Sequence, residues 1–280
     1  METRWIERGG DPRRLALYRQ LGRVETLADE SGRALIFANG AVGDFTGDAR
    51  LLSRVEDRLR AWGVTEAVGP LDGNTFFPYR VNLGPLDVRP FSGEPTGCPE
   101  PWRRLGWRED ARYTSSICPN APQIENARPL PAGWRARPVD FDRFAPELEA
   151  LYRVTLGAFS EAWRYMPLPF PAFSALYSPY RDRVDPRWVR VAEDPEGTVQ
   201  GYLFAWPEEG RFVIKTLAVH PDARGKRVSS HLMGLVHAFA AEQGIPAGIH
   251  ALMWEGSLSQ VVTAHGSRVF RRYALYRKRL

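Results

Sequence analysis

Residues 212–244 constrain the fold most strongly, because they have the pattern of a strand, a basic turn and a helix. The apolar residues at 212–214 and 217–219 are typical of a buried strand, and Pro221 ends it because proline cannot extend a sheet ladder. The turn at 224–229 is basic. Beyond it, apolar residues recur at helical spacing as far as Gly244, namely Val228, Leu232, Leu235, Val236 and Phe239. Free amides and the positive end of a helix favour phosphate, so the pattern predicts an anion site at this turn.

The segment LAVHPDARGKRVS, residues 217–229, resembles motif A of the GNAT (GCN5-related N-acetyltransferase) superfamily. In that family a strand leads into a [Q/R]-x-x-G-x-[G/A] loop that holds the acetyl-CoA pyrophosphate. Arg224 matches the first position and Ser229 is a small residue at the last. Arg227 departs from the pattern, because a motif glycine usually stands there and lets the backbone approach phosphate closely.

The resemblance implies acetyl-CoA, or another acyl-CoA, as cosubstrate. Its pantetheine arm would pair with the backbone of Leu217, Ala218 and Val219. The expected pyrophosphate loop consists of Arg224, Gly225, Lys226, Arg227, Val228 and Ser229. The alternative for this segment is an ordinary strand–helix unit with a solvated basic turn, in which Leu217 and Val219 serve only as core residues.

The order of expected elements over residues 134–280 is that of the GNAT fold. It comprises a strand at 135–139, a helix with apolar positions from 144 to 159, strands at 188–192 and 200–206, the motif, a strand at 249–253, a short helix or turn at 256–265 and a last strand at 269–276. The predicted fold class is α/β, with a central mixed, mostly antiparallel sheet flanked by helices. We expect residues 134–280 to form the acetyl-CoA-binding domain.

The first half echoes the second. Residues 47–50 (GDAR) precede a helix that closes at Gly63, as residues 221–224 (PDAR) precede the motif helix, and Tyr113 and Tyr273 each follow a glycine by the same spacing. From Arg50 to Gly63 is 13 positions, against 20 from Arg224 to Gly244, so a segment the size of the loop is missing. We therefore predict a degenerate GNAT-like domain without a cofactor loop at 1–118 and a proline-rich linker at 119–133. Two unrelated α/β domains are the alternative.

Acyl transfer to an amine needs a base and benefits from an acid at the departing thiolate. Many family members carry a glutamate two positions before the Leu217 equivalent, where this chain has Lys215. The remaining catalytic candidates are Glu255 after the fifth strand of the domain, His250 on it and Tyr273 on the last strand. Each has a structural alternative: a hydrogen-bonded strand residue for His250, a turn residue for Glu255 and a cross-strand neighbour for Tyr273.

Composition excludes several other classes. Only three of the 38 basic residues are lysines and the formal net charge of +5 is spread along the chain, so a nucleic-acid partner is not expected. The beginning of the chain does not resemble a signal peptide, no stretch is apolar enough for a membrane helix, and the two cysteines lack metal or redox spacing. No spacing of the five histidines indicates a metal site. We expect a cytoplasmic protein with no membrane partner and no metal.

The predicted function is an acyl-CoA-dependent N-acyltransferase, a GNAT-type N-acetyltransferase that transfers acetyl to an amine in a ternary complex. The acceptor is an amine of a small molecule or a peptide, and the pattern indicates no oligomeric state. The aromatic and proline-rich segment at 163–180 lies where this fold usually shapes the acceptor pocket. The competing hypotheses are a non-catalytic acyl-CoA-binding or sensor protein and, in third place, a nucleic-acid-binding protein.

Overall fold

The chain divides into two compact units. The computed structural model describes residues 12–85, 87–257, 260 and 264–280. Unit 1 consists of Met1–Tyr113 with Arg271–Leu280, and unit 2 of Thr114–Phe270. The chain therefore passes between the units twice: it enters unit 2 within the strand β6 (Arg108–Pro119) and returns to unit 1 within the strand β12 (Arg268–Arg279).

Unit 1 contains an antiparallel sheet whose order is β1-β2-β3. Its strands β4 and β5 pair antiparallel with β12, the last strand of the chain. The elements of this unit are α1 (Pro12–Arg19), β1 (Val24–Asp29), β2 (Gly32–Phe37), β3 (Val42–Thr46), α2 (Ala49–Ala61), β4 (Glu66–Gly69), β5 (Val81–Asn82) and α3 (Glu100–Arg104).

The core of unit 1 forms around Trp102, which is fully buried. Its ring packs edge-on against Trp107 and Phe45, with centroids 4.9 and 5.1 Å away. Helix α2 contributes one apolar face of Leu51, Leu52, Val55 and Leu59, each with no exposed surface. This spacing is the helical period that the sequence predicted, so α2 folds because one of its faces can be buried.

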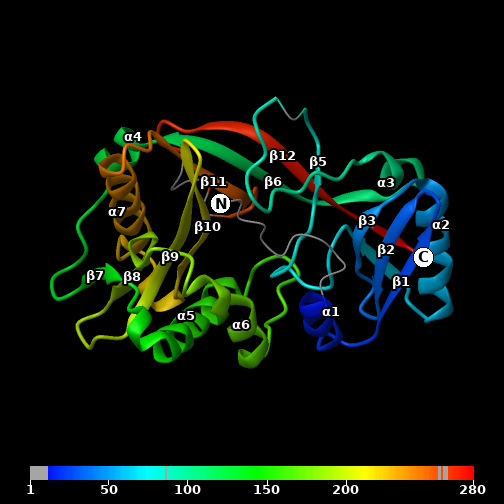
Figure 1. Ribbon diagram of the computed structural model, residues 1–280, viewed down its shortest axis with the longest axis horizontal. Coiled ribbons are helices and arrows are strands. Elements are labelled where there is room, and N and C mark those ends of the chain that lie inside the picture. Colours follow the sequence, from blue (N-terminus) through cyan, green and yellow to red (C-terminus); the bar gives the residue numbers. More distant parts are fainter. Residues whose placement is uncertain (1–11, 86, 258–259, 261–263) are drawn as a thin grey trace. The chain divides into compact units, whose positions relative to one another are not determined.

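In the sheet of unit 2, β10 and β11 are parallel, whereas the pairs β7–β8, β8–β9 and β9–β10 are antiparallel. Helices α5 and α6 lie on one side of this sheet and α7, packed against α4, on the other (Figure 1). The elements are α4 (Asn120–Glu125), β7 (Arg135–Pro138), α5 (Phe144–Phe159), α6 (Phe170–Tyr177), β8 (Val189–Glu193), β9 (Val199–Glu208), β10 (Arg211–Val219), α7 (Val228–Glu242) and β11 (Ala247–Trp254), with short 3-10 turns at Phe141–Arg143, Ser178–Tyr180, Pro186–Trp188 and Pro221–Ala223.

The predicted α/β class with mixed sheets flanked by helices is confirmed. The helix α4 lies within the expected linker at 119–133, and two further short elements, α3 and β5, lie within the proline- and glycine-rich residues 81–104. These elements have only two to six residues, too few to show a hydrophobic period. Part of the helix or turn expected at 256–265 lies outside the described residues.

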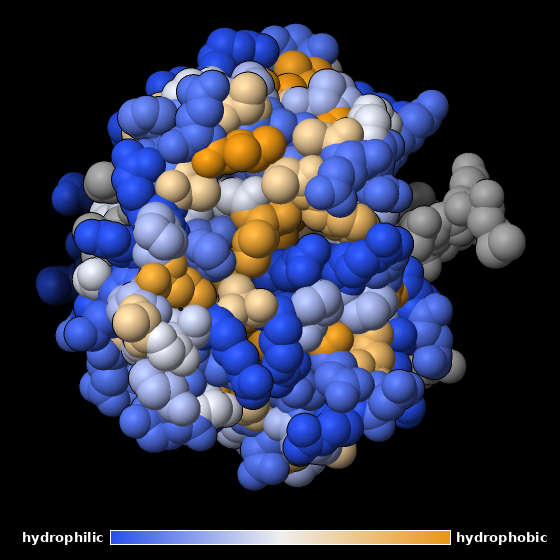
Figure 2. Space-filling model, turned by 90° about the vertical axis from the view of Figure 1, so that its left-hand side faces the viewer, coloured by the Kyte–Doolittle hydropathy of each residue, from blue (hydrophilic) through white to orange (hydrophobic). Residues whose placement is uncertain are grey.

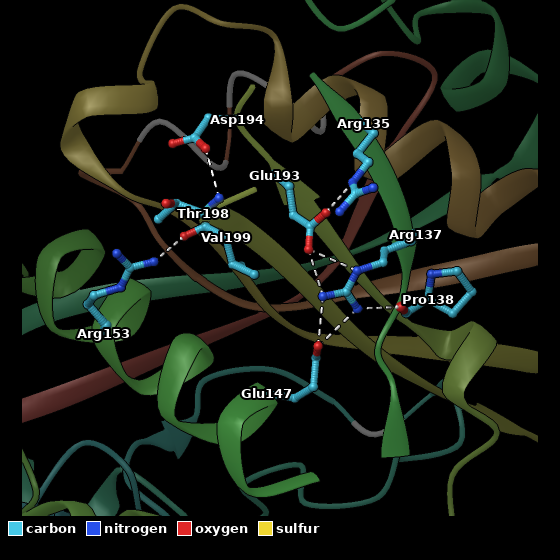
Figure 3. A network of polar contacts seen from close by, with 9 residues as sticks. All are labelled: Arg135, Arg137, Pro138, Glu147, Arg153, Glu193, Asp194, Thr198 and Val199. Atoms are coloured by element: carbon cyan, nitrogen blue, oxygen red, sulfur yellow. Dashed lines mark hydrogen bonds and ion pairs between the residues drawn. The ribbon is translucent and has the colours of Figure 1, made fainter. Parts of the chain in front are cut away.

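An ion-pair network ties β7 and β8 to α5 in unit 2 (Figure 3). The Arg137 guanidinium contacts Glu193 Oε1 at 2.7 Å and Glu147 Oε1 at 2.7 Å, and both carboxylates are buried. Burial alone would raise the pKa of Glu193, but hydrogen bonds from Arg137 and Arg135 outweigh it and lower that pKa. One arginine therefore bridges two buried carboxylates and links β7 and β8 to α5.

The surface of unit 2 that carries α7 and α4 is predominantly hydrophilic, with hydrophobic side chains in small groups (Figure 2). Among the described residues, three large hydrophobic side chains are exposed: Ile124, Met166 and Val269. No helix in the described part of the chain combines the length and the apolar character needed to span a bilayer.

Candidate functional site

The strands β10 and β11 of unit 2 pair over a short stretch and then part. Their parallel register covers Phe212, Val213 and Ile214 against Gly248, Ile249 and His250. Beyond Ile214, β10 bulges at Lys215 and continues to pair with β9 on its other side. Among the described residues, 216–219 consequently have a β9 partner along one edge and no strand partner along the edge towards β11. A backbone edge of this kind can bind an extended ligand through main-chain hydrogen bonds.

The open edge leads into the turn at residues 224–229. Gly225 and Arg227 both have left-handed backbone, with φ of 78° and 66°. Within the described chain, the amides of Gly225, Arg227, Val228 and Ser229 have no hydrogen-bond acceptor, and α7 begins without a side-chain cap. These amides are the unsatisfied donors expected at a helix start, so the turn is chemically suited to an anion.

Arg227 stands where the motif usually has glycine, and its backbone has the left-handed conformation that glycine favours. A left-handed φ strains a residue that has a Cβ, and for this reason glycine is usual there. The chain nevertheless adopts the turn with arginine, whose charge faces solvent beside those of Lys226 and Arg224. Arg224 also contacts Glu161 Oε2 at 3.5 Å, an exposed pair that links the turn to the segment after α5.

In unit 1, the helix start that corresponds to the N-terminus of α7 is the N-terminus of α2, and a side chain of the protein caps it. The Asp48 side chain caps α2 by accepting hydrogen bonds from the amides of Arg50 and Leu51 at 2.9 and 3.1 Å. The N-terminus of α2 thus carries a carboxylate where the N-terminus of α7 has free amides.

The edge of β3 in unit 1 is also paired, because residues that follow β4 hydrogen-bond to it. Ala41 forms one parallel bridge with Val68, after which the amide of Leu71 donates to the carbonyl of Val42 at 2.7 Å. The amide of Asp44 then donates to Asp72 Oδ1, also at 2.7 Å. The two units therefore share a strand and helix arrangement, but only unit 2 leaves both the edge and the helix start open.

His250, one of the three predicted catalytic residues, lies buried on the α7 side of the sheet. Its Nε2 is 2.9 Å from His237 Nε2, and His237 Nδ1 is 2.9 Å from Asn120 Oδ1. Asn120 Nδ2 donates to the carbonyl of Ile245, so its Oδ1 accepts from His237 Nδ1–H. His237 Nε2 then accepts from His250 Nε2–H, which leaves His250 Nδ1 buried and without a partner.

Burial keeps both imidazoles neutral. It lowers the pKa of His237 to about 3, and burial together with the neighbouring His237 lowers the pKa of His250 well below its usual value. The helix α7 covers this pair, since Phe212 on β10 and His237 on α7 also meet with ring centroids 4.9 Å apart. The pair has the character of a buried hydrogen-bonded core element.

The other two candidates are not brought to the same place. Glu255 is exposed in the turn after β11. Tyr273 belongs to unit 1, has no exposed surface and donates its hydroxyl hydrogen bond to Glu94 Oε1. That glutamate also accepts from the fully buried Arg271 at 2.8 Å. The roles of Glu255, His250 and Tyr273 in catalysis stay predictions.

The structure adds a row of aromatic side chains on the α5 and α6 side of the sheet that the sequence analysis did not single out. Tyr202 meets Thr155 of α5, with the two hydroxyl oxygens 2.8 Å apart. Phe204 contacts Tyr180 at 5.0 Å and Trp206 at 5.6 Å between ring centroids. The alternation of Tyr202, Phe204 and Trp206 along β9 was the available signal, because residues two apart share one side of a strand.

In comparisons with known proteins, residues 148–260 match the acetyltransferase (GNAT) family model. The search of curated proteins found no match. The similar solved structures include a GCN5-related N-acetyltransferase from Sphaerobacter thermophilus, at 14% identity and a TM-score of 0.56, which covers 88% of this chain and 76% of that one. They also include a tandem GNAT protein from the clavulanic acid biosynthesis pathway, at 12% identity and a TM-score of 0.57, which covers 88% of this chain and 78% of that one.

In the described part of the chain, the fold is a mixed α/β arrangement in which the backbone edge of residues 216–219 and the start of α7 are both open. Residues 148–260 match the GNAT acetyltransferase family model, and the matched segment contains the turn at 224–229. At these low identities the structural neighbours establish the fold and nothing finer. The family supports acyl-CoA-dependent N-acyltransferase activity in general.

Proposed function

We propose that this protein transfers an acetyl group from acetyl-CoA to the amine of a small molecule or peptide, by direct attack in a ternary complex. The observation that carries the proposal is that, in the described part of unit 2, a backbone edge at 216–219 without a strand partner towards β11 leads along the chain into a turn whose amides lack an acceptor. The pantetheine arm would pair with Leu217, Ala218 and Val219. The pyrophosphate would lie on the loop of Arg224, Gly225, Lys226, Arg227, Val228 and Ser229.

Unit 1 would hold no cosubstrate. Asp48 places a carboxylate at the start of α2, which repels phosphate, and residues 71–72 already hydrogen-bond to β3. The proposed organisation keeps the degenerate domain at 1–118, the linker at 119–133 and the acyl-CoA-binding domain at 134–280. One acetyl-CoA per chain is the expected stoichiometry.

Calorimetry with acetyl-CoA tests this function. We expect binding at one site per chain, and its loss in a variant that combines Arg224→Ala with Gly225→Leu. Gly244→Leu is the matched control, because Gly244 at the other end of α7 has a φ of 72° and an equally open surrounding. Absence of acetyl-CoA binding by the wild-type protein, or equal binding by the loop variant, would refute the proposal.

A non-catalytic acyl-CoA-binding or sensor protein is the second candidate. The observations that favour it are Lys215 at the bulge, which is not a carboxylate base, and the burial of His250 beneath α7. Release of free CoA from acetyl-CoA in the presence of a broad panel of amines would decide for the enzyme. Binding without turnover of any amine would decide for the sensor.

A further inference from the structure

The two strands that part beside the open edge both lose regular geometry just after their last pair. The parallel register of β10 and β11 ends at Ile214 and His250. On β10, the register with β9 shifts at the bulge that follows Ile214. On β11, Leu252 has a left-handed backbone with a φ of 55°. A leucine in this conformation is uncommon, because its Cβ crowds the backbone, and the surrounding structure has to hold it there.

The place of Leu252 along β11 decides whether the edge of β10 stays open. The two strands pair at an offset of 36 positions (250 − 214), so continued pairing would set Thr216 opposite Leu252. The strand β11 runs on to Trp254 and β10 to Val219, so both are long enough for that pairing. A left-handed residue in a strand bends the strand and disrupts its ladder. Leu252 therefore turns β11 aside at the first position from which it could cover the edge of residues 216–219.

Ser115 of β6 contacts Leu252 at this bend. In the strand order, β6 neighbours β11 on the side away from β10, and its residues from Thr114 onward belong to unit 2. The amide of Leu252 donates a hydrogen bond to Ser115 Oγ at 3.0 Å. Ser115 has no exposed surface, so water does not replace its hydroxyl, and a buried amide that loses its acceptor is unfavourable. The hydrogen bond thus directs the Leu252 amide towards β6.

We propose that Ser115 is a positioning residue of the acyltransferase, which fixes the left-handed Leu252 and so keeps the edge of residues 216–219 open for the acyl-CoA. The inference rests on the proposed function, because that function assigns the edge to the pantetheine arm. Ser115 touches neither cosubstrate nor acceptor in this scheme and acts through the course of β11. Without the hydroxyl, Leu252 returns to the extended conformation that leucine favours, and β11 pairs with the edge that the ligand needs.

Ser115→Ala tests the proposal through two measurements on the full-length protein. Calorimetry should show acetyl-CoA binding about tenfold weaker than in the wild type, the factor that a hydrogen bond of ordinary strength supplies. Hydrogen exchange of the ligand-free variant should be slower at residues 216–219, because amides of this edge gain carbonyl partners on β11. A variant that was merely destabilised would exchange faster there. Ser116→Ala is the matched control, since it removes the next hydroxyl along β6, which is also buried, and should change neither measurement.

Leu252→Gly provides the rescue, because glycine adopts a left-handed φ without a supporting contact. In that background Ser115→Ala should change the acetyl-CoA affinity by less than about threefold, since the contact it removes is no longer needed. This comparison decides the question even where Ser115→Ala alone does not fold.

Three results each overturn the proposal by itself: equal acetyl-CoA affinity in the wild type and Ser115→Ala, faster exchange at residues 216–219 in Ser115→Ala, or an undiminished effect of Ser115→Ala in the Leu252→Gly background. In all three the wild-type protein still binds acetyl-CoA, so the proposed function stands. Failure of the wild-type protein to bind acetyl-CoA would overturn the proposed function and this inference with it.

Discussion

Acid should destabilise unit 2 through the buried histidine pair. His237 has no exposed surface, and burial lowers its pKa to about 3 from an ordinary value near 6.5. Because the pKa of His237 is lower in the folded than in the unfolded chain, the unfolded chain binds more protons between these two pKa values. The contribution of neutral His237 to the unfolding free energy is complete above pH 6.5 and is lost as the pH falls from 6.5 towards 3.

The size of the effect follows from the linkage relation. Each pH unit below 6.5 lowers the unfolding free energy by about 1.4 kcal/mol. At pH 5 the titration of His237 alone therefore lowers it by about 2 kcal/mol. His250 adds to this in the same direction, since burial and its neighbour depress its pKa as well. The variant His237→Gln removes the titrating group and keeps a neutral polar side chain.

Urea denaturation followed by tryptophan fluorescence at several values from pH 7.5 to pH 5 measures the effect. The difference in unfolding free energy between wild type and His237→Gln should shrink by about 2 kcal/mol over that range. His265→Gln removes an exposed histidine and should give a curve parallel to that of the wild type. A difference between wild type and His237→Gln that stays constant with pH would refute the reasoning.

Two further substitutions address the cores of the units. Arg137→Met should destabilise the protein by about 3 kcal/mol in urea denaturation, because it leaves the buried Glu147 and Glu193 without their shared partner; an effect below about 1 kcal/mol would show that solvent reaches both carboxylates. Trp102→Ala should cost about 3 to 5 kcal/mol, since it removes a fully buried ring from the core of unit 1; an unchanged denaturation midpoint would contradict the packing described here.

The sequence was informative where structure follows from local pattern. The helical spacing of Leu51, Leu52, Val55 and Leu59 predicted α2, and the strand–turn–helix pattern at 212–244 predicted β10, the turn and α7. An aspartate immediately before a helical pattern, such as Asp48, is a helix-capping signal that can be recognised from the neighbouring residues. In such segments the groups that interact lie within a few positions of one another, so their order along the chain is enough.

What the sequence could not supply were the relations between distant segments. The pairing of His250 with His237 depends on how α7 packs on the sheet, and the residues next to either histidine in the sequence do not indicate this pairing. The bulge at Lys215 inserts one residue into the alternation of β10, so the sides taken by Leu217 and Ala218 could not be counted along the strand.

The sequence by itself determined the class of fold, the position of the turn between β10 and α7, and the echo between the two halves. Tertiary structure decided the destinations of the two last strands, since β6 passes into unit 2 and β12 returns to unit 1. Strand pairing across more than a hundred residues depends on which edge is vacant when the chain folds, and local pattern does not encode that. It also decided that Lys215, which lies over the Trp206 ring, and His250, which meets His237 of α7, lie on opposite sides of one sheet.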